Sequence, residues 1–300
     1  MHLITGANGM TGRAVLAALK SRGARVRVLA TSAASAGSLL EAGADEAALG
    51  RFDDAASLER AMAGVETVFH VPPRMKPDEV ANGFAVIAAA RSAGVARIAL
   101  HSVVNPQVDA IAFHAAKRRV EEAAVLSGLR WIVVQPTNYM QNVAWNWARL
   151  TEHGGLLFPY AAAAKVSWLD LEDYAPAVAR LLTEPGFDHG TYEAVSTADP
   201  LDRHELAAIW SKVLGRPVVA ETMPLDDYMA LPHWRGRDPR EMAILRTMFE
   251  TFDRHGSPGG ASKVLSWLLG REPTGYAAFA ERFARARQPS SPRNGPTAAS

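Results

Sequence analysis

The feature that most constrains the fold is a set of three glycines near the start of the chain, in the segment HLITGANGMTGRAVLAAL. Gly6, Gly9 and Gly12 lie between a short apolar run and an amphipathic helical pattern. In such a segment the first glycine permits a tight turn, the second lets a pyrophosphate approach the backbone, and the third lets the helix pack closely on the strand. The helix N-terminus offers free N–H groups and a positive dipole end to phosphates. The residues predicted to form this dinucleotide-binding turn are Gly6, Asn8, Gly9, Met10, Thr11 and Gly12.

Short apolar runs alternate with longer helical patterns along the first half of the chain, which is typical of a parallel sheet built from crossover units. We expect strands over residues 2–5, 25–30, 46–50, 67–71, 97–102 and 131–135. Helical spacing covers residues 13–21, 57–63, 79–93 and 113–127. The expected fold class is therefore α/β, a Rossmann-type doubly wound parallel sheet with a smaller, mainly helical C-terminal substrate domain.

The regularity loosens after Pro136, where a strand over 166–169, a helix over 173–182 and a strand over 191–195 precede a helical region. We expect a Rossmann domain over residues 1–155, joined by a returning strand and helix over 165–183. A smaller cap domain is expected over 184–287. Residues 288–300 are rich in Pro, Ser and Gly and are predicted to form a disordered tail. Asp170 and Asp173 fit a helix N-terminus and are predicted to be structural.

The composition predicts a globular, soluble protein, because 48% of the 300 residues are hydrophobic and only 21% are charged. With 32 basic and 31 acidic residues, the charge balance favours neither nucleic acid nor a membrane surface as a partner. Cysteine is absent, which excludes disulfides and Cys-ligated metals and fits a reducing compartment. No targeting segment or apolar run of roughly 18 residues is visible. We expect a cytoplasmic monomer or homodimer that acts on a small molecule.

The glycine spacing is G-x-x-G-x-x-G, and with it the chain resembles the NmrA-like group of atypical short-chain dehydrogenases, whose openings are of the TGATGxxG type. The resemblance covers nearly all of the chain apart from the tail, and its landmarks arrive in the family's order. It implies an NADP(H)-binding fold, in a group that includes quinone reductases, isoflavone-type reductases and redox-sensing regulators. The further matching segments are DDAASLERAMAGVETVFHV, AGVARIALHSVV, HAAKRRVEEA, QPTNYMQN, KVSWLDLEDYAPAVARLL and LLGREP.

The choice of cofactor depends on the end of the second strand, where an acid would bind the ribose of NAD and a basic residue the 2′-phosphate of NADP. The chain has Ala30, Thr31 and Ser32 at this place. The lack of an acid disfavours strict use of NAD, and the two hydroxyls are able to donate to a phosphate. The arginine that the resemblance implies at Thr31 is missing, while Arg51 either reaches the phosphate or lies in solvent. We therefore expect NADP(H), with NAD(H) as the alternative.

The proton-transfer group is expected in the segment FHAAK. Short-chain dehydrogenases normally place a Tyr four residues before a Lys, which lowers the pKa of the phenol. Here Lys117 matches the Lys, but Phe113 occupies the Tyr position, so the usual relay cannot operate. The resemblance implies that Lys117 contacts the nicotinamide ribose and acts as a general base, which makes it the predicted catalytic residue. The alternative is an exposed helix face on which Lys117 pairs with Glu121, and Arg118 with Glu122.

Further cofactor contacts are expected where parallel strands end, because the carboxyl edge of the sheet faces the ligand crevice. Val71 and Pro72 follow the fourth strand and Ser102 ends the fifth, and the resemblance adds a loop that passes the nicotinamide. The alternative roles are ordinary ones, such as a proline that closes a turn or a tyrosine in the core. The residues predicted to bind the cofactor outside the glycine turn are Thr31, Ser32, Val71, Pro72, Ser102, Lys117, Pro136, Thr137, Asn138 and Tyr139.

An apolar substrate cleft is expected beside this loop, with His114, Tyr139 and Met140 as candidate lining residues. His70, His101 and His114 lack metal-ligand spacing, so no metal is expected. The later half of the chain supplies large apolar side chains that form either core or pocket. They include Trp145, Trp147, Trp168, Tyr228, Trp234 and Phe249.

Two functions from different classes follow from these residues. The first is an NAD(P)H-dependent oxidoreductase that transfers a hydride to a small, mainly apolar carbonyl or quinone. The second is a non-catalytic redox sensor of NmrA type, which the missing Tyr and the missing phosphate-binding arginine also favour. A nucleotide-sugar epimerase is disfavoured, because that chemistry depends on the Tyr that Phe113 replaces.

Overall fold

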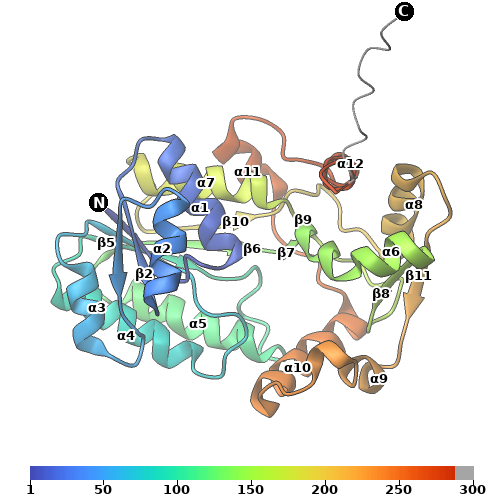
Figure 1. Ribbon diagram of the computed structural model, residues 1–300, viewed down its shortest axis with the longest axis horizontal. Coiled ribbons are helices and arrows are strands. Elements are labelled where there is room, and N and C mark those ends of the chain that lie inside the picture. The colour runs from blue at the N-terminus through green and yellow to red at the C-terminus, as the bar shows by residue number, and fades with distance from the viewer. Residues whose placement is uncertain (288–300) are drawn as a thin grey trace, which may run out of the picture.

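The computed structural model describes residues 1–287, so the predicted tail over 288–300 lies outside the described residues. A parallel sheet of seven strands forms its centre (Figure 1). The strands are β1 (His2–Ile4), β2 (Val26–Ala30), β3 (Glu46–Leu49), β4 (Thr67–His70), β5 (Arg97–His101), β6 (Arg130–Pro136) and β10 (Gly190–Ala194). Their order is β10-β6-β5-β4-β1-β2-β3. The chain first adds strands on one side of β1, as β2 and β3, and then crosses to the other side to add β4 and the strands that follow. The predicted Rossmann-type sheet is confirmed, and its ligand crevice lies at this crossing point.

Helices cover both faces of the sheet (Figure 1). On one face lie α1 (Met10–Ser21), α2 (Ala33–Glu41), α7 (Leu171–Thr183) and α11 (Ser262–Leu269). On the other face lie α3 (Ala55–Met62), α4 (Glu79–Ser92) and α5 (Ala112–Val125). Of these helices, α2 was not predicted from the sequence. Within residues 1–287, no helix is long and apolar enough to cross a bilayer.

Successive side chains of each strand point to opposite faces of the sheet. In β2, Val26 and Val28 belong to the core under α1 and α7, whereas Leu29 belongs to the core under α3 and α4. In β4, Phe69 and Val68 divide in the same way. Because helices cover both faces, the strands appear in the sequence as continuous apolar runs rather than as alternating ones.

A second lobe extends from one end of the sheet (Figure 1). Its core is rich in aromatic side chains and includes the buried Trp210 and Phe279. The chain enters it through β7 (Asn138–Tyr139), which pairs with β9 (Trp168–Leu169) outside the main sheet. The lobe contains η1 (Met140–Asn146), α6 (Trp147–His153), β8 (Gly155–Phe158), α8 (Arg203–Leu214), β11 (Val219–Thr222), α9 (Leu225–Met229), η2 (Pro232–Trp234), α10 (Pro239–His255) and α12 (Tyr276–Arg285).

The chain passes between the sheet and the second lobe more than once, so the two parts are not consecutive in sequence. Within residues 184–287, β10 pairs with β6 and α11 packs on α7, which places both with the sheet. Within residues 1–155, η1 and α6 pack into the core of the second lobe through Met140, Val143 and Leu150. The division at residue 155 expected from the sequence therefore does not separate the two hydrophobic cores.

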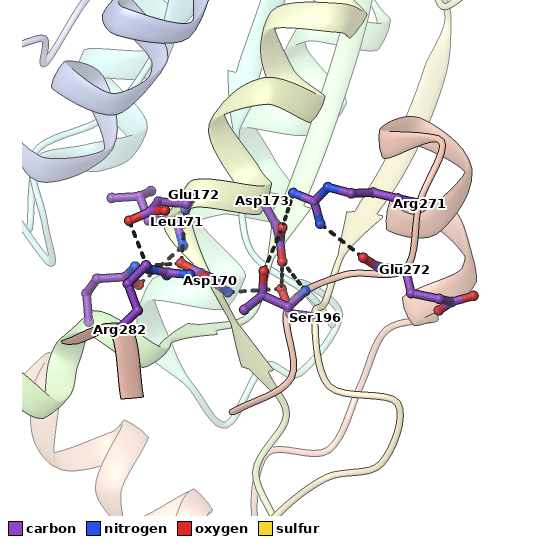
Figure 2. A network of polar contacts seen from close by, with 10 residues as sticks. Asp170, Leu171, Glu172, Asp173, Ser196, Arg271, Glu272 and Arg282 are labelled. Carbon is purple, nitrogen blue, oxygen red and sulfur yellow. Dashed lines mark hydrogen bonds and ion pairs between the residues drawn. The ribbon is translucent and has the colours of Figure 1, made fainter. Parts of the chain in front are cut away.

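Two fully buried carboxylates tie α7 to the C-terminal part of the chain (Figure 2). Asp170 caps α7 by accepting a hydrogen bond from the Glu172 N–H at 3.0 Å, and it pairs with Arg282 of α12. Asp173 pairs with Arg271, the two side chains lying 2.7 Å apart. The structural role predicted for both aspartates is confirmed, since they hold the segment that follows α11 against the start of α7.

Candidate active site

A cavity of about 650 Å³ lies between the carboxyl edge of the sheet and the second lobe. It contacts the glycine turn, the ends of β4, β5 and β6, and the first half of α5. The predicted residues that line it are Gly6, Gly9, Met10, Thr11, Val71, Pro72, Ser102, His114, Lys117, Pro136, Thr137, Asn138 and Tyr139. The cavity therefore gathers most of the predicted site from segments that are distant in sequence.

The glycine turn has the geometry that a pyrophosphate requires. Gly6 adopts a φ of +61°, and a Cβ there would collide with the carbonyl oxygen of Val71. A Cβ on Gly12 would lie 2.5 Å from the Ala7 Cα, so only glycine lets α1 pack this closely. Gly9 caps α1 with extended backbone, and the first turn of α1 carries no acidic residue. The Gly9 N–H donates to the Gly6 carbonyl at 3.1 Å. The first N–H groups of α1 have no acceptor within the helix and are available to an anion, so the site fits a dinucleotide.

The adenosine end of the predicted site is less enclosed. Thr31 and Ser32 are exposed and do not line the cavity, and the Ser32 hydroxyl accepts the N–H of Ser35 as the cap of α2. Arg51 pairs with Asp53 at 2.9 Å, and both side chains are exposed. An exposed pair of this kind exchanges partners at little cost, so Arg51 is able to turn from Asp53 to a phosphate.

Arg13 is a basic residue near the glycine turn that the sequence analysis missed. Its guanidinium donates to Asn8 Oδ1 at 2.5 Å and to Ser38 Oγ at 2.9 Å. It therefore spans from α1 to α2, beside the place where a dinucleotide phosphate would lie. Its position in the first turn of the predicted helix was the available signal, but many surface arginines occupy such positions.

Lys117 is held by a buried ion pair with Glu79 at the first residue of α4. The Lys117 Nζ lies 2.8 Å from the Glu79 Oε1, and the two side chains are 11% and 4% exposed. Lys117 also donates to the backbone carbonyl of His101 at 3.4 Å. An ammonium has three donors, so one remains directed elsewhere. The geometry places Lys117 in the cavity wall and not on a solvated helix face.

The ion pairs that the alternative reading expected along α5 do not form. Glu121 accepts from the Ser102 hydroxyl and from the Gln135 amide at 3.0 Å, and burial raises the pKa of its carboxyl. Arg118 pairs instead with Asp109 at 2.9 Å. The pairing along α5 that was the alternative to a cavity role for Lys117 is absent, because α5 packs on the sheet and Glu121 turns inward to polar groups at the ends of two strands.

A small space of about 10 Å³ lies beneath Lys117 and is lined by His70, Glu79, His101 and Ser102. His70 Nδ1 lies 2.9 Å from the Thr5 hydroxyl oxygen. Among residues 1–287, none makes a hydrogen bond to His70 Nε2. A space of this size accommodates one water between polar partners. Burial lowers the pKa of His70 to about 3, so its imidazole is neutral at physiological pH.

Tyr139 lies at the junction of the glycine turn and the strand ends. Its hydroxyl accepts a hydrogen bond from Thr11 at 3.2 Å, and its ring stacks on His101. His101 Nδ1 in turn lies 2.6 Å from the hydroxyl of Tyr174. Burial raises the pKa of Tyr139, which keeps its phenol protonated. The phenol is therefore a positioning group here. His101 also lines the cavity; it was not among the predicted site residues, although it lies in the predicted strand that ends at Ser102.

The three substrate candidates separate in the structure. Tyr139 and His114 line the cavity, whereas Met140 is fully buried in the core of the second lobe and does not. His114 Nδ1 donates to the Asn105 carbonyl at 2.9 Å, and burial lowers its pKa to about 4. Met140 turns away because it starts η1, whose apolar side packs against α6 and β8.

Large aromatic side chains close the cavity on the side of the second lobe. Some of the rings that the sequence left as either core or pocket lie in this wall, while Trp147 packs in the core against Trp210. Such a surface binds flat apolar molecules by stacking and excludes water. The aromatic residues of the wall are Phe113, Trp145, Phe158, Tyr160, Trp168, Tyr228, Trp234, Phe249 and Phe252.

Comparison with known proteins agrees with this geometry. The model of the NmrA-like family matches residues 2–279. The NAD(P)H azoreductase of Xenophilus azovorans is 32% identical over 291 residues, which cover 95% of this chain and 99% of that protein. A (4-alkanoyl-5-oxo-2,5-dihydrofuran-3-yl)methyl phosphate reductase of Streptomyces griseus subsp. griseus is 34% identical over 232 residues, covering 75% and 78%.

A solved structure shares the whole fold. The NADPH-dependent quinone oxidoreductase of Escherichia coli, in complex with NADPH, has a TM-score of 0.83 at 25% identity. The match covers 95% of this chain and 100% of that chain. The glycine turn, the sheet order and these matches lead to one assignment. The chain belongs to the NmrA-like family.

Proposed function

We propose that this protein is an NAD(P)H-dependent reductase of flat, mainly apolar acceptors such as quinones and azo compounds. The observation that carries the proposal is one cavity that contacts both the glycine turn and the aromatic wall of the second lobe. A hydride donor and a planar acceptor are thereby able to lie in one enclosed space. The azoreductase and the quinone oxidoreductase among its relatives support this class of substrate.

The residues around the cavity have distinct roles in this proposal. When bound, the cofactor supplies the hydride. Gly9 and the N-terminus of α1 hold its phosphates, and Tyr139 contacts it from the strand ends. Lys117 binds the ribose or delivers a proton, because two of its donors are held by Glu79 and His101 and the third is available. Phe113 lines the cavity where other short-chain dehydrogenases carry a Tyr, so the phenol relay is replaced by the ammonium.

NADPH is the proposed cofactor in preference to NADH. No acidic residue stands at the end of β2, where it would bind the ribose of NAD. Thr31 follows β2, and Arg13 of α1 reaches Ser38 of α2, so both residues are candidates to bind a 2′-phosphate. Calorimetric titration with NADPH and NADH measures the preference directly, and a lower dissociation constant for NADH would overturn it.

We also infer that the protein works in the cytoplasm as a monomer or a homodimer. The lack of cysteine is compatible with a reducing compartment. Exposed apolar side chains on the outer helices, such as Phe84 of α4 and Leu126 after α5, offer a surface that a second copy would cover. Light scattering on the purified protein distinguishes the two masses.

The test is NADPH oxidation, followed by its absorbance, with naphthoquinones, azo dyes and aliphatic aldehydes as acceptors. The proposal expects oxidation with the planar acceptors and little with the aldehydes. The alternative is a cofactor sensor, which Phe113 favours because it removes the usual proton donor. A sensor would bind NADP⁺ and NADPH with unequal affinity. It would oxidise NADPH no faster than the uncatalysed rate, with the planar acceptors and with the aldehydes alike.

A further inference from the structure

The charges in the cavity wall do not cancel. Three charged side chains line the cavity within residues 1–287, namely Arg74, Glu79 and Lys117. Glu79 and Lys117 neutralise each other at 2.8 Å. The lining histidines are neutral, because burial lowers the pKa of His114 to about 4 and that of His101 well below its ordinary value. Arg74 therefore leaves one uncompensated positive charge in an otherwise aromatic wall.

Arg74 lines the cavity from the loop between β4 and α4. Its guanidinium carbon lies 4.2 Å from the centre of the Trp145 ring. Within residues 1–287 no carboxylate pairs with it and no acceptor takes a hydrogen bond from it. Desolvation lowers the pKa of Arg74 to about 10, and the nearby Arg237 adds to the shift. A pKa of about 10 keeps the guanidinium charged at neutral pH, and its donors have no partner within the described residues.

The loop holds Arg74 on the substrate side of the cavity. Met75 adopts a φ of +51°, a conformation that bulky residues rarely take, and its side chain packs against the core of the second lobe. Arg74 lies over the ring of Trp145 and interacts through its charge with Arg237 and Tyr228, and these three residues all belong to the second lobe. Arg74 therefore belongs to the side of the cavity that the second lobe forms.

We propose that Arg74 and Trp145 select planar aromatic substrates that carry an acidic substituent, such as a sulfonate or a carboxylate. This inference rests on the proposed reductase function and narrows its substrate class. The guanidinium lies over the Trp145 ring, and its N–H groups are available to two oxygens of one anion. The aromatic body of the same molecule then lies against the rings of the second lobe.

The test compares anthraquinone-2-sulfonate with anthraquinone-2-sulfonamide, which has nearly the same shape and no charge. Dissociation constants are measured by quenching of tryptophan fluorescence, with and without NADP⁺, so no turnover is needed. The wild type should bind the sulfonate about tenfold more tightly than the sulfonamide. Arg74→Gln should reduce this preference to about twofold without weakening the sulfonamide, and Arg74→Glu should invert it.

Arg235→Gln is the matched control, because Arg235 is an exposed arginine of the second lobe that does not line the cavity. It should leave the preference unchanged, and thermal unfolding should confirm that every variant is folded. Equal affinity of the wild type for both compounds, or a preference that survives in Arg74→Gln, would overturn the inference.

If the sulfonate preference depends on Arg74 but NADPH is never oxidised, the reductase proposal fails and the anion site stands. If both quinones are reduced with the same kcat/KM and bound equally, the reductase stands and the anion site fails.

Discussion

At the scale of single residues, Gly9 offers the most direct test of cofactor binding. Its φ of −75° and ψ of 166° suit any residue, and a Cβ there would meet only the Gly6 carbonyl oxygen at 3.4 Å. Gly9→Val should therefore keep the fold but weaken NADPH binding by about 100-fold or more, because its side chain takes the space of the pyrophosphate. Calorimetric titration with NADPH measures the change.

Gly37→Ala is the control for this variant, since Gly37 lies in α2 with open space around it. It should bind NADPH like the wild type. A folded Gly9→Val protein with unchanged affinity for NADPH would show that the dinucleotide does not bind at the glycine turn.

Lys117 requires a paired substitution, because its removal leaves the carboxylate of Glu79 buried without a partner. Lys117→Met alone should lower the free energy of unfolding by about 3 kcal/mol, as expected when one partner of a buried ion pair is removed and the other charge stays buried. Lys117→Met combined with Glu79→Gln should recover most of this stability, since no buried charge remains. Quinone reduction should stay about 10² below the wild-type rate in both variants. Thermal unfolding and NADPH oxidation separate the two effects.

Two results would count against this account of Lys117. A double variant that reduces quinones at the wild-type rate would show that Lys117 neither positions nor protonates the substrate. A single variant as stable as the wild type would show that the pair with Glu79 does not hold in solution.

The residues of the site were predictable where a local motif fixes them. Gly6 and Gly9 stand in a segment whose spacing indicates a dinucleotide turn, and the family resemblance indicates a role for Lys117. Glu79 and Arg74 were not predictable, because each meets its partner from a different element across the fold. The periodicity of one segment predicts its own secondary structure and cannot predict a contact between two segments.

At the scale of elements, the carboxylate of Asp173 joins α7 to the segment between α11 and α12 (Figure 2). It is fully buried, accepts the Thr274 N–H at 2.6 Å and the Ser196 hydroxyl at 2.9 Å, and pairs with Arg271. Asp173→Asn should lower the free energy of unfolding by about 2 to 3 kcal/mol, because a charge-assisted acceptor is lost in a buried position. Denaturant titration measures it.

The matched control is Asp226→Asn. Asp226 also pairs with an arginine at 2.7 Å, Arg246, but its side chain is 84% exposed. The change should cost at most about 0.5 kcal/mol. If the two substitutions cost the same, burial of the Asp173 pair does not contribute to stability as described.

The sheet strands were predictable as elements because burial on both faces produces apolar runs bounded by turns. The short parallel pair β8–β11 was not, since each strand has four residues and no distinctive pattern. The helix α2 was missed because its sequence, AASAGSLLE, is rich in small residues and serine and contains a glycine. Its cap at Ser32 was the signal that could have revealed it.

At the scale of the whole molecule, neutral buried histidines make stability depend on pH. Burial lowers the pKa of His114 from 6.5 to about 4, so the unfolded chain binds a proton between these values that the native protein does not. The contribution of His114 to stability should therefore be constant above pH 6.5 and should fall as the pH decreases toward 4, by up to about 1.4 kcal/mol per pH unit. Chemical denaturation across this range measures the slope.

His114→Gln should make this slope shallower, because glutamine still donates to Asn105 but does not titrate. His153→Gln serves as the control, since that side chain is 69% exposed. An identical slope in His114→Gln and the wild type would contradict the buried neutral state of His114.

The overall architecture was predictable further than its division into parts. The NmrA-like fold and the sheet followed from the glycine turn and the strand alternation. The sequence did not reveal that β10 and α11 belong to the sheet, or that η1 and α6 belong to the second lobe. The order of elements along a chain suggests consecutive domains instead. The cavity depends on this interleaving of segments, since the chain passes between the sheet and the second lobe at β7 and β9 and so places the second lobe over the strand ends.

The central claim is that a cofactor and a planar acceptor react in one cavity between the sheet and the second lobe. Rapid mixing of the preformed NADPH complex with a naphthoquinone, followed by NADPH absorbance in a single turnover, tests it most directly. The account predicts an oxidation phase in the wild type that is faster than the uncatalysed reaction by at least about 10² and absent in Gly9→Val. An NADPH complex that forms normally but decays at the uncatalysed rate would contradict it.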